Sequence, residues 1–437
     1  MRINFKGKNV LVYGMGVSGQ AASKLLHGQG ACVSVYDDEN RFGNFFPFEI
    51  SPTSKKYDYV VVSPGVKVLG NNIISHFILS RTKILSELDL AYLFNRATVV
   101  GITGTNGKTT VTSLVGEILK TAGKKVFVCG NIGLPFSSIA EKTTKDSIAV
   151  CEVSNLQLEL SSVFKSHIAA ILNIAPDHLD RHGTFEEYVR CKKKIIHSKK
   201  QKLVLNFDDE IVRALQINQK TLFFSKKILK KGVFIKNNAI YYNKSKIISI
   251  IDIPLFGEKN IENVMAAVAV CVRLKIKPSI IRQAIINFKA PSHRLEFLGE
   301  LNGAMVFDDS KATNVSSCLA AISSLGERGL VLLLGGQNKD FKFDEIFSQG
   351  MDFENILCFG QAGREIYDCG VKYGYKPVLF DSMKEAAIYA RTNARDGQKI
   401  LLSPACASFD EFASYAVRGT VFKEIMFGEN EKIEIEF

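Results

Sequence analysis

This sequence lacks the features that mark membrane-spanning, exported and disulfide-stapled proteins. Its apolar runs, such as residues 59–62 and 331–334, are far shorter than the roughly 20 residues that cross a bilayer. The N-terminal stretch MRINFKGKNVLVYG contains no apolar segment followed by a small-residue cleavage site. None of the nine cysteines belongs to a CxxC pair. We therefore expect a cytoplasmic protein without membrane insertion, whose cysteines are reduced thiols in the core.

Internal repeats, low-complexity tracts and blocks of one charge are also missing. Hydrophobic residues make up 46% of the chain and charged residues 23%, which excludes a disordered or fibrous protein. The net charge is +12, from 56 lysines and arginines against 44 acidic residues, and the lysines are scattered along the sequence. This pattern favours an anionic ligand over a nucleic-acid-binding tail. A basic nucleic-acid-binding ATPase would need clustered arginines and aromatic patches, so we expect no nucleic-acid partner.

The length of 437 residues predicts about three domains at roughly 150 residues each. Strand and helix patterns alternate along the chain, which predicts the α/β class. We place the domain boundaries after residue 93 and after residue 290. Residues 1–93 predict a Rossmann-like domain, with strands expected at residues 9–14, 32–36 and 59–62 and helices at 20–26 and 84–94.

Residues 94–290 predict a P-loop ATPase-like central domain, in which a parallel sheet is accompanied by a small antiparallel sheet. Strands are expected at residues 98–103, 148–151 and 168–173, an antiparallel meander at 233–251, and helices at 111–119, 260–274 and 278–288. Residues 291–437 predict a second Rossmann-like domain. Its strands are expected at residues 305–307, 330–334, 356–359, 378–380 and 400–402.

The strongest motif is a phosphate loop at residues 101–109. The sequence GITGTNGKT matches G-x4-G-K-[ST], and it lies between an expected strand and an amphipathic helix. Backbone N–H groups of such a loop surround a phosphate, and the helix N-terminus adds partial positive charge. Lys108 would reach the β- and γ-phosphates, and the Thr109 hydroxyl would bind Mg²⁺. The sequence therefore predicts an ATP site.

A second glycine motif lies at residues 14–19. Gly14, Gly16 and Gly19 match G-x-G-x-x-G after a strand, and Asp37 ends the second strand, where a ribose-binding acid would lie. Alone, the motif would indicate an NAD-dependent dehydrogenase, but the same turn can bind another nucleotide diphosphate or be purely structural. Because the chain also has an ATP loop, we favour ATP-driven work on a nucleotide-linked substrate.

A series of ordered blocks resembles the Mur ligases of bacterial cell-wall synthesis. The blocks are GITGTNGKTT (101–110), GNIGLP (130–135), EVSNLQLE (152–159), NIAPDHLDRHGTFEEYVRCKK (173–193), GEKNIENVMAA (257–267), SHRLE (292–296), DDSKATN (308–314), GGQNKDF (335–341) and SPACASFDEF (403–412). The resemblance implies that the first domain binds a UDP moiety, the central domain ATP, and the C-terminal domain an amino acid. DDSKATN favours D-glutamate over the amino acids of related ligases.

The resemblance implies ATP-dependent ligation of D-glutamate to UDP-N-acetylmuramoyl-L-alanine through an acyl phosphate, by an enzyme that we expect to be a monomer. It implies two Mg²⁺ ions and a carbamylated Lys192 that serves as a metal ligand. The implied metal ligands are Thr109, Glu152, His178 and Lys192. The implied catalytic residues are Lys108, Glu152, His178 and Lys192. The implied ATP-binding residues are Gly104, Asn106, Gly107, Lys108, Thr109, Thr110, Asn260, Asn263, Arg294 and Asp309.

The resemblance also implies two groups of substrate-binding residues. Those for the nucleotide sugar are Val17, Ser18, Asp37, Ser63, Gly65, Asn131, Ser154 and Gln157. Those for D-glutamate are Lys311, Thr313, Lys339 and Ser408, with the backbone of Phe409. Two lysines for two carboxylates are electrostatically reasonable.

Several of these residues have simpler interpretations. Lys192, Lys193 and Lys194 form a run, which is ordinarily a solvated helix face, and the carbamate position could fall on Lys193 instead. A lone histidine such as His178 is usually structural. Asn260 lies near an expected helix start and could be an ordinary N-cap. The structure has to distinguish these alternatives.

Overall fold

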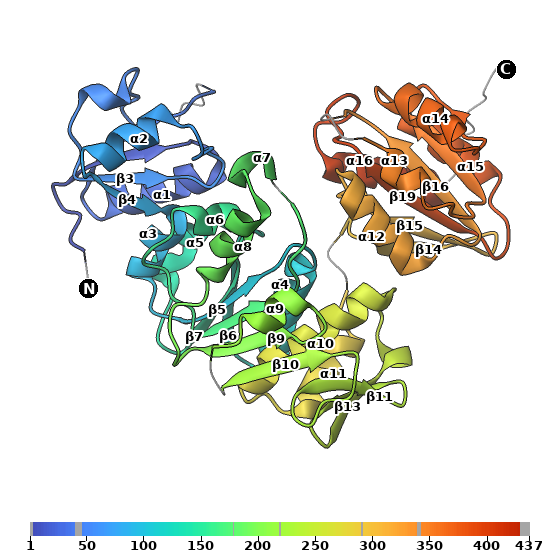
Figure 1. The fold of residues 1–437 in the computed structure, drawn as a ribbon, viewed down its shortest axis with the longest axis horizontal. Coiled ribbons are helices and arrows are strands. Elements are labelled where there is room, and N and C mark those ends of the chain that lie inside the picture. Colours follow the sequence, from blue (N-terminus) through green and yellow to red (C-terminus); the bar gives the residue numbers. More distant parts are fainter. Residues whose placement is uncertain are drawn as a thin grey trace. The chain divides into compact units, whose positions relative to one another are not determined.

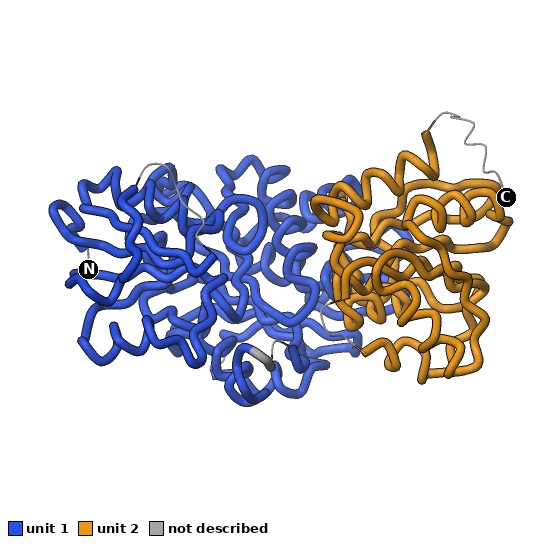
Figure 2. Tube along the Cα trace, turned by 90° about the horizontal axis from the view of Figure 1, so that it is seen from above, with its two compact units in different colours: residues 1–254, 261–288 blue, residues 255–260, 289–437 orange. Residues whose placement is uncertain are grey.

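The computed structural model describes residues 3–39, 46–177, 179–217, 220–289, 292–338 and 342–428, with the side chains of Leu179 and Asp180 left out. The chain divides into two compact units (Figure 2). The first comprises Met1–Pro254 and Ile261–Phe288, and the second comprises Leu255–Asn260 and Lys289–Phe437. Each unit is described separately below. The fold is α/β throughout, as the sequence predicts (Figure 1).

The first compact unit begins with a parallel four-stranded sheet in the order β2-β1-β3-β4. Its elements are β1 (Asn9–Tyr13), α1 (Val17–Gly28), β2 (Cys32–Tyr36), η1 (Pro52–Ser54), β3 (Tyr59–Val62), α2 (Asn72–Leu79), β4 (Lys83–Ser86) and α3 (Glu87–Phe94). The expected helix over residues 84–94 is wrong in its first part, because Ile84–Ser86 pair with β3 as a strand. Helix α3 starts only where the Ser86 hydroxyl caps it by accepting the Asp89 N–H.

The central sheet of the same unit has nine strands in the order β13-β12-β11-β10-β9-β8-β5-β7-β6. Its strands are β5 (Thr98–Thr103), β6 (Lys125–Gly130), β7 (Ser147–Glu152), β8 (Ile168–Ile171), β9 (Lys202–Asn206), β10 (Thr221–Ser225), β11 (Val233–Lys236), β12 (Ala239–Tyr242) and β13 (Ser245–Ser249). The antiparallel strands β11–β13 continue the parallel sheet, because β11 pairs in parallel with β10. The sequence analysis missed β6, β9 and β10.

Helices cover this sheet and connect its strands. They are α4 (Lys108–Thr121), α5 (Phe136–Ile139), η2 (Ala140–Lys142), α6 (Asn155–Glu159), α7 (Leu179–His182), α8 (Phe185–Lys193), α9 (Glu210–Ala214), η3 (Ile250–Asp252), α10 (Glu258–Arg273) and α11 (Pro278–Ile286). Helix α4 ends just before Gly123, which has a positive φ of 70° and stops the helix as expected.

A buried carboxylate fastens α3 to the central sheet. Asp89 accepts hydrogen bonds from the Ser161 hydroxyl and from the backbone N–H groups of residues 162–164, at 2.8–2.9 Å. These residues lead into β8. One apolar core also runs from Phe5 in the first segment to Leu215 beyond β9. This shared core explains why the two sheets belong to one compact unit.

The second compact unit contains a six-stranded sheet in the order β14-β15-β19-β16-β17-β18, parallel except for β14. Its elements are β14 (Glu296–Leu301), β15 (Ala304–Asp308), α12 (Val315–Leu325), β16 (Leu330–Gly335), α13 (Asp344–Phe347), β17 (Asn355–Phe359), α14 (Gly363–Lys372), β18 (Val378–Leu379), α15 (Met383–Thr392), β19 (Lys399–Ala405) and α16 (Tyr415–Phe427). Apolar clusters fill both faces of this sheet. All five strands expected after residue 290 are present.

All nine cysteines are free thiols, and seven of them are buried, whereas Cys32 is exposed. Among the described residues, no helix combines the length and apolar character that a membrane span requires.

Gly19 permits the close approach of α1 to the glycine turn. A Cβ atom at this position would lie 1.8 Å from the Gly14 carbonyl oxygen, whereas one at Gly28 in the same helix would meet nothing within 4 Å. We expect Gly19→Ala to lower the free energy of unfolding by about 3 kcal/mol through overpacking. Gly28→Ala should change it by less than about 1 kcal/mol. Urea unfolding of both variants checks this, and equal effects would contradict the packing argument.

Candidate active site

The phosphate loop connects the central strand β5 to α4. Gly107 caps the helix with a φ of 82°, and a Cβ atom there would lie 2.1 Å from Asn263 Oδ1. Glycine is therefore required both by the backbone conformation and by the neighbouring α10. The loop presents Gly104, Asn106 and Gly107 before the first turn of α4, where Thr110 is partly exposed. This strand, loop and helix form an anion site of the kind that binds nucleotide phosphates.

Two lysine amines meet at this loop. Lys108 Nζ donates hydrogen bonds to the carbonyl oxygens of Gly104 at 2.9 Å and of Thr105 at 2.7 Å. Lys192 Nζ, from α8, donates to the same Gly104 oxygen at 2.9 Å. The loop thus brings two potential cations to the place where a triphosphate would lie.

The structure separates the three consecutive lysines of α8. Lys192 is fully buried, whereas Lys193 and Lys194 are exposed. The Lys192 amine lies 4.7 Å from the centre of the Tyr188 ring. Burial, followed by repulsion from Lys108, lowers the pKa of Lys192 to about 7. Burial therefore favours the unprotonated form of this amine. The interpretation of the lysine run as a wholly solvated face is wrong for Lys192.

Oxygen ligands for a cation lie beside the loop at the carboxyl end of β7. Glu152 is buried, and its two carboxylate oxygens accept hydrogen bonds from Thr109 Oγ1 and from Asn131 Nδ2, both at 2.9 Å. Strands β5 and β7 are adjacent and parallel, so their carboxyl ends lie together. Hydroxyl and carboxylate oxygens are the ligands that Mg²⁺ prefers.

Further residues, which the sequence analysis missed, hold the loop in place. The Thr105 hydroxyl hydrogen-bonds to Tyr188 OH at 2.9 Å and to the Ala175 carbonyl at 3.1 Å. Asn173 accepts the Asn106 N–H at 2.8 Å and donates to the Asn106 carbonyl at 3.1 Å. Asn173 and Tyr188 lie inside the block at residues 173–193. Nothing in the composition of that block indicates that they position the phosphate loop.

The second glycine motif borders a cavity of about 370 Å³ at the carboxyl ends of β1 and β3. Five of the eight residues expected to bind the nucleotide sugar line it, namely Val17, Ser18, Asp37, Ser63 and Gly65, whereas Asn131, Ser154 and Gln157 do not. This is the place where open parallel sheets bind ligands.

Two of the lining side chains also have structural partners. The buried Asp37 carboxylate accepts the Met15 N–H at 2.6 Å and the Glu39 N–H at 3.0 Å. Ser63 Oγ donates to the Gly14 carbonyl at 2.6 Å. Both residues therefore fix the glycine turn, whichever ligand the cavity takes.

Ser154 and Gln157 form a capping box at the start of α6. Ser154 Oγ accepts the Gln157 N–H at 3.2 Å, and Gln157 Oε1 accepts the Ser154 N–H at 3.0 Å. The structure thus accounts for both residues through local helix capping. Their expected role in substrate binding stays a prediction.

In the second compact unit, the loop before β14 has a strained backbone. His293 and Leu295, on either side of Arg294, have positive φ angles of 63° and 45°. The Nε atom of Arg294 is buried and has no hydrogen-bond partner among the described residues. An unsatisfied guanidinium N–H on a strained loop is suited to an anionic ligand.

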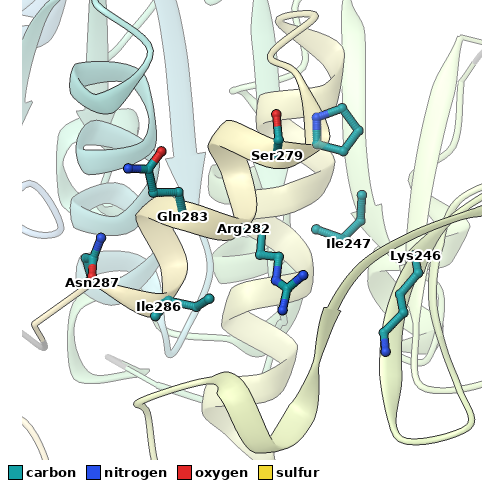
Figure 3. A pocket seen from close by; sticks show the side chains of 8 residues that line it. Lys246, Ile247, Ser279, Arg282, Gln283, Ile286 and Asn287 are labelled. Atoms are coloured by element: carbon teal, nitrogen blue, oxygen red, sulfur yellow. The ribbon is translucent and has the colours of Figure 1, made fainter.

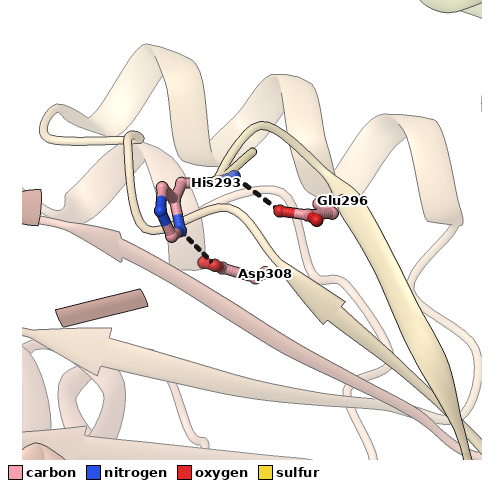
Figure 4. A group of neighbouring side chains, drawn as sticks. All are labelled: His293, Glu296 and Asp308. Carbon is pink, nitrogen blue, oxygen red and sulfur yellow. Dashed lines mark hydrogen bonds and ion pairs between the residues drawn. The ribbon is translucent and has the colours of Figure 1, made fainter. Parts of the chain in front are cut away.

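Acidic residues at the end of β15 hold this loop. His293 Nδ1 and Asp308 Oδ2 are 2.6 Å apart, and Glu296 accepts the His293 N–H at 2.9 Å (Figure 4). The hydrogen bond to Asp308 raises the pKa of His293. Asp309 accepts the Leu295 N–H at 3.0 Å and the Ser403 hydroxyl at 2.8 Å. Burial raises the pKa of Asp309 to about 7.

Four of the residues expected to bind D-glutamate, Lys311, Thr313, Ser408 and Phe409, lie on two loops that a buried arginine joins. Arg418 donates to the hydroxyl and carbonyl of Ser310 at 3.0 and 2.9 Å, and to the carbonyls of Cys406 and Ala407 at 3.0 and 3.1 Å. It therefore connects the loop of Lys311 and Thr313 to the loop of Ser408 and Phe409. The sequence analysis did not assign Arg418 a role.

Individual positions on these loops differ in exposure. The Lys311 amine lies 5.0 Å from the centre of the Tyr415 ring, Ser408 is buried, and Phe409 is 63% exposed.

The Asn260 side chain donates to the Phe256 carbonyl at 2.8 Å from inside the first turn of α10, so it is no simple N-cap. His178 and Lys339 lie outside the described residues.

Comparison with known proteins decides the family. Residues 102–271 match the model of the Mur ligase middle domain, and residues 293–406 match that of the Mur ligase glutamate ligase domain. A relative from Thermoanaerobacter sp. (strain X514), named UDP-N-acetylmuramoylalanine–D-glutamate ligase, is 37% identical over 97% of this chain and 98% of its own. A relative of the same name from Clostridioides difficile (strain 630) is 37% identical over 97% and 99%. The chain belongs to the Mur ligase family.

Solved structures of Mur ligases share its three-domain fold. UDP-N-acetylmuramate-alanine ligase MurC from Thermotoga maritima superposes with a TM-score of 0.60 at 16% identity, covering 95% of this chain and 98% of its own. MurF from the same organism, in complex with ADP, gives 0.59 at 18% identity, covering 96% and 94%. As a Mur ligase, the protein is an ATP-dependent enzyme of peptidoglycan precursor synthesis that forms amide bonds.

For this Mur ligase we expect Lys108→Ala to lower kcat at least about 100-fold, because the variant loses a cation aimed at developing phosphate charge. Folding should persist, since the hydrogen bonds that the lysine amine donates to Gly104 and Thr105 go to carbonyl oxygens of the loop and do not hold the core together. ADP release and thermal unfolding measure the two effects. Lys120→Ala, on the exposed side of the same helix, should keep wild-type turnover. A folded Lys108→Ala enzyme with near-normal turnover would contradict the ATP site.

Proposed function

We propose that this Mur ligase joins D-glutamate to UDP-N-acetylmuramoyl-L-alanine, releasing UDP-N-acetylmuramoyl-L-alanyl-D-glutamate, ADP and phosphate. The observation that carries the proposal is the similarity, over nearly the whole length of both chains, to relatives named for this reaction. The block DDSKATN at residues 308–314 supports the same amino-acid specificity. A Mur ligase that adds another amino acid is the nearest alternative.

The proposal divides the work among three parts of the chain. Residues 1–93 bind the UDP moiety in the cavity beside the glycine turn, and residues 94–290 bind ATP at the phosphate loop. Residues 291–437 bind D-glutamate and contribute Arg294 and Asp309 to the nucleotide. Support comes from the separate sheets and from the position of each candidate site at the carboxyl ends of parallel strands.

The chemistry requires activation of a carboxylate. We infer that the substrate carboxylate attacks the γ-phosphate of ATP, which forms an acyl phosphate and releases ADP. The amine of D-glutamate then attacks the acyl carbon and displaces phosphate. Lys108 neutralises the β- and γ-phosphate oxygens, while Asn260 and Asn263 contact the adenine side. Closure of the C-terminal domain would exclude water from the acyl phosphate.

We propose that this edge of the sheet holds two magnesium ions. Thr109 and Glu152, which are hydrogen-bonded to each other, would supply a hydroxyl and a carboxylate for one ion, and His178 with carbamylated Lys192 would hold the second. Bound Mg²⁺ would offset the charge of the phosphates and of the attacking carboxylate. The buried Lys192 amine fits carbamylation, because only an unprotonated amine reacts with CO2 and burial lowers the pKa of this amine to about 7.

The amino-acid site would use Lys311, Thr313, Lys339, Ser408 and the Phe409 backbone. Arg418 supports this assignment, since it ties the two loops that carry most of these residues. We propose that the enzyme acts as a monomer. The nine free cysteines support work in the reducing cytoplasm.

The test of the reaction is a coupled assay of ADP release. With UDP-N-acetylmuramoyl-L-alanine and ATP present, we expect turnover on addition of D-glutamate and little or none with L-glutamate. Equal turnover with the L enantiomer, or turnover only with a different amino acid, would contradict the proposed specificity.

In Lys311→Ala, KM for D-glutamate should rise at least about 10-fold, because a charge-assisted contact to a carboxylate is lost. Affinity for the UDP substrate should be unchanged.

We further expect Lys192→Ala to be nearly inactive and to be partly restored by short-chain carboxylic acids, which supply the missing ligand oxygens. Removal of dissolved CO2 should lower the activity of the wild type but leave the rescued variant unaffected. Lys193→Ala is the matched control, because this neighbouring lysine is exposed. Full activity of Lys192→Ala, or loss in Lys193→Ala instead, would show that the carbamate is assigned to the wrong residue.

A further inference from the structure

Nearly all of the net positive charge of the chain comes from one segment. Residues 220–289 contain twelve lysines and two arginines against three acidic residues, a net charge of +11. The remaining 367 residues contain 42 basic and 41 acidic residues, a net charge of +1. The lysines are spread along the whole sequence, but those not balanced by acidic residues belong mainly to β10–β13, α10, α11 and their connections.

Eight exposed cations of this segment form what we call the basic surface. They are Lys227, Lys230, Lys231, Lys244, Lys246, Lys275, Lys277 and Arg282. Within the described part of the chain, Arg282 pairs with Asp252 at 3.4 Å and the seven lysines have no ion-pair partner. Seven unpaired ammonium groups are available to an external anion.

Interactions made by residues next to these cations in the sequence show which parts of the basic surface lie close together. Asn243 exchanges two hydrogen bonds of 3.0 Å with Gly232, which brings Lys244 beside Lys231. Arg273, two residues before Lys275, donates to the Lys220 carbonyl and interacts electrostatically with Tyr242. These two interactions connect the end of α10 to the start of β10 and to the end of β12.

The helix α11 completes the basic surface. Lys246 and Arg282 line a cavity of about 430 Å³ between β13 and α11, together with Pro278, which follows Lys277 (Figure 3). Strand β13 is an edge strand of the nine-stranded sheet, so no further strand pairs with it among the described residues.

An exposed apolar side chain lies among these cations. The loop from β10 to β11 reads KKILKK at residues 226–231, and Ile228 is 66% exposed between the two lysine pairs. Exposed aliphatic side chains surrounded by lysines are typical of segments that rest in the headgroup region of a bilayer. Nucleic-acid surfaces instead use arginines and stacking aromatics, and the basic surface has one arginine among eight cations.

The basic surface is also distinct from the catalytic machinery. The phosphate loop, Glu152 and Lys192 belong to β5, β7 and α8, whereas the basic surface belongs to the opposite end of the nine-stranded sheet. Phosphate binding at the active site already uses Lys108. The additional cations are therefore available to a different anionic partner.

We propose that the basic surface binds peripherally to a membrane that contains anionic phospholipids, with the lysines on the headgroups and Ile228 among them. Each lysine near an anionic bilayer strengthens adsorption about fivefold. The binding would be reversible and sensitive to salt, because the charges are exposed. It needs no membrane-spanning segment, and it is independent of which amino acid the enzyme ligates.

Co-sedimentation of the full chain with vesicles tests the proposal. We expect binding to vesicles of phosphatidylglycerol mixed with phosphatidylcholine, little binding to phosphatidylcholine alone, and release as salt is raised. A variant with Lys227, Lys230, Lys231 and Lys244 all changed to Gln should bind at least about 100-fold more weakly. Ile228→Ser should weaken binding without changing its salt dependence. Both variants should keep wild-type ligase activity in solution.

A matched control changes four exposed lysines elsewhere, Lys6, Lys376, Lys384 and Lys423, to Gln. It has the same net charge as the test variant and should bind vesicles like the wild type. Equal losses in both variants, or no binding of the wild type to anionic vesicles, would overturn the proposal. Single-stranded RNA that binds more tightly than the vesicles, and loses binding in the test variant, would identify a nucleic-acid surface instead.

Discussion

One carbonyl oxygen, that of Gly104, accepts hydrogen bonds from two lysine amines, and the active site depends on this convergence. Lys108 and Lys192 each donate to it at 2.9 Å. Two ammonium groups that share one acceptor repel each other, and burial adds a desolvation penalty for the charged form of Lys192. The protein reduces the conflict by lowering the pKa of Lys192 to about 7. An anion at the loop, whether a phosphate or a carbamate, would remove the conflict altogether.

The geometry of the sheet creates this convergence. Strand β5 lies between β7 and β8, so the loops after all three strands meet at one edge. The loop after β5 leads to Lys108, and the loop after β7 follows Glu152. The loop after β8 contains Asn173, whose side chain accepts a hydrogen bond from the Asn106 N–H. Helix α8 then contributes Tyr188 and Lys192 from one turn of its inner face. The hydrogen bond between Tyr188 and Thr105 couples the position of the helix to the loop that receives its lysine.

Sequence reasoning predicted the parts of this site that depend on local patterns. The phosphate loop follows from glycine spacing, and strands such as β1, β5 and β16 follow from apolar runs bounded by turns. It failed where tertiary pairing overrides propensity, as at Ile84–Ser86, which become a strand only because β3 lies alongside. Strands β6, β9 and β10 were missed for a different reason. Their apolar runs, VFVC, LVL and LFF, are only three or four residues long, and such short runs are hard to tell from buried helix or loop segments.

Side-chain roles were less predictable than elements, because burial decides them. Lys192, Lys193 and Lys194 are chemically identical in the sequence, and only packing against Tyr188 distinguishes the buried amine. Asp37 and Ser63 were assigned to a ligand, but their bonds to the glycine turn show that such residues also hold the backbone. Arg418 was missed because a buried arginine that bonds four backbone and hydroxyl groups has no local motif.

The effect of charge also depends on where the fold places each charged side chain. A net charge read from the whole sequence cannot say where the field lies, since residues far apart in the chain come together in the fold. At the phosphate loop, the negative charge of Asp177 partly offsets the positive charge of Lys192. At the other end of the sheet seven lysines have no such partners within the described residues. Their mutual repulsion opposes folding, so a ligand that neutralises them would stabilise the domain as well as localise the enzyme.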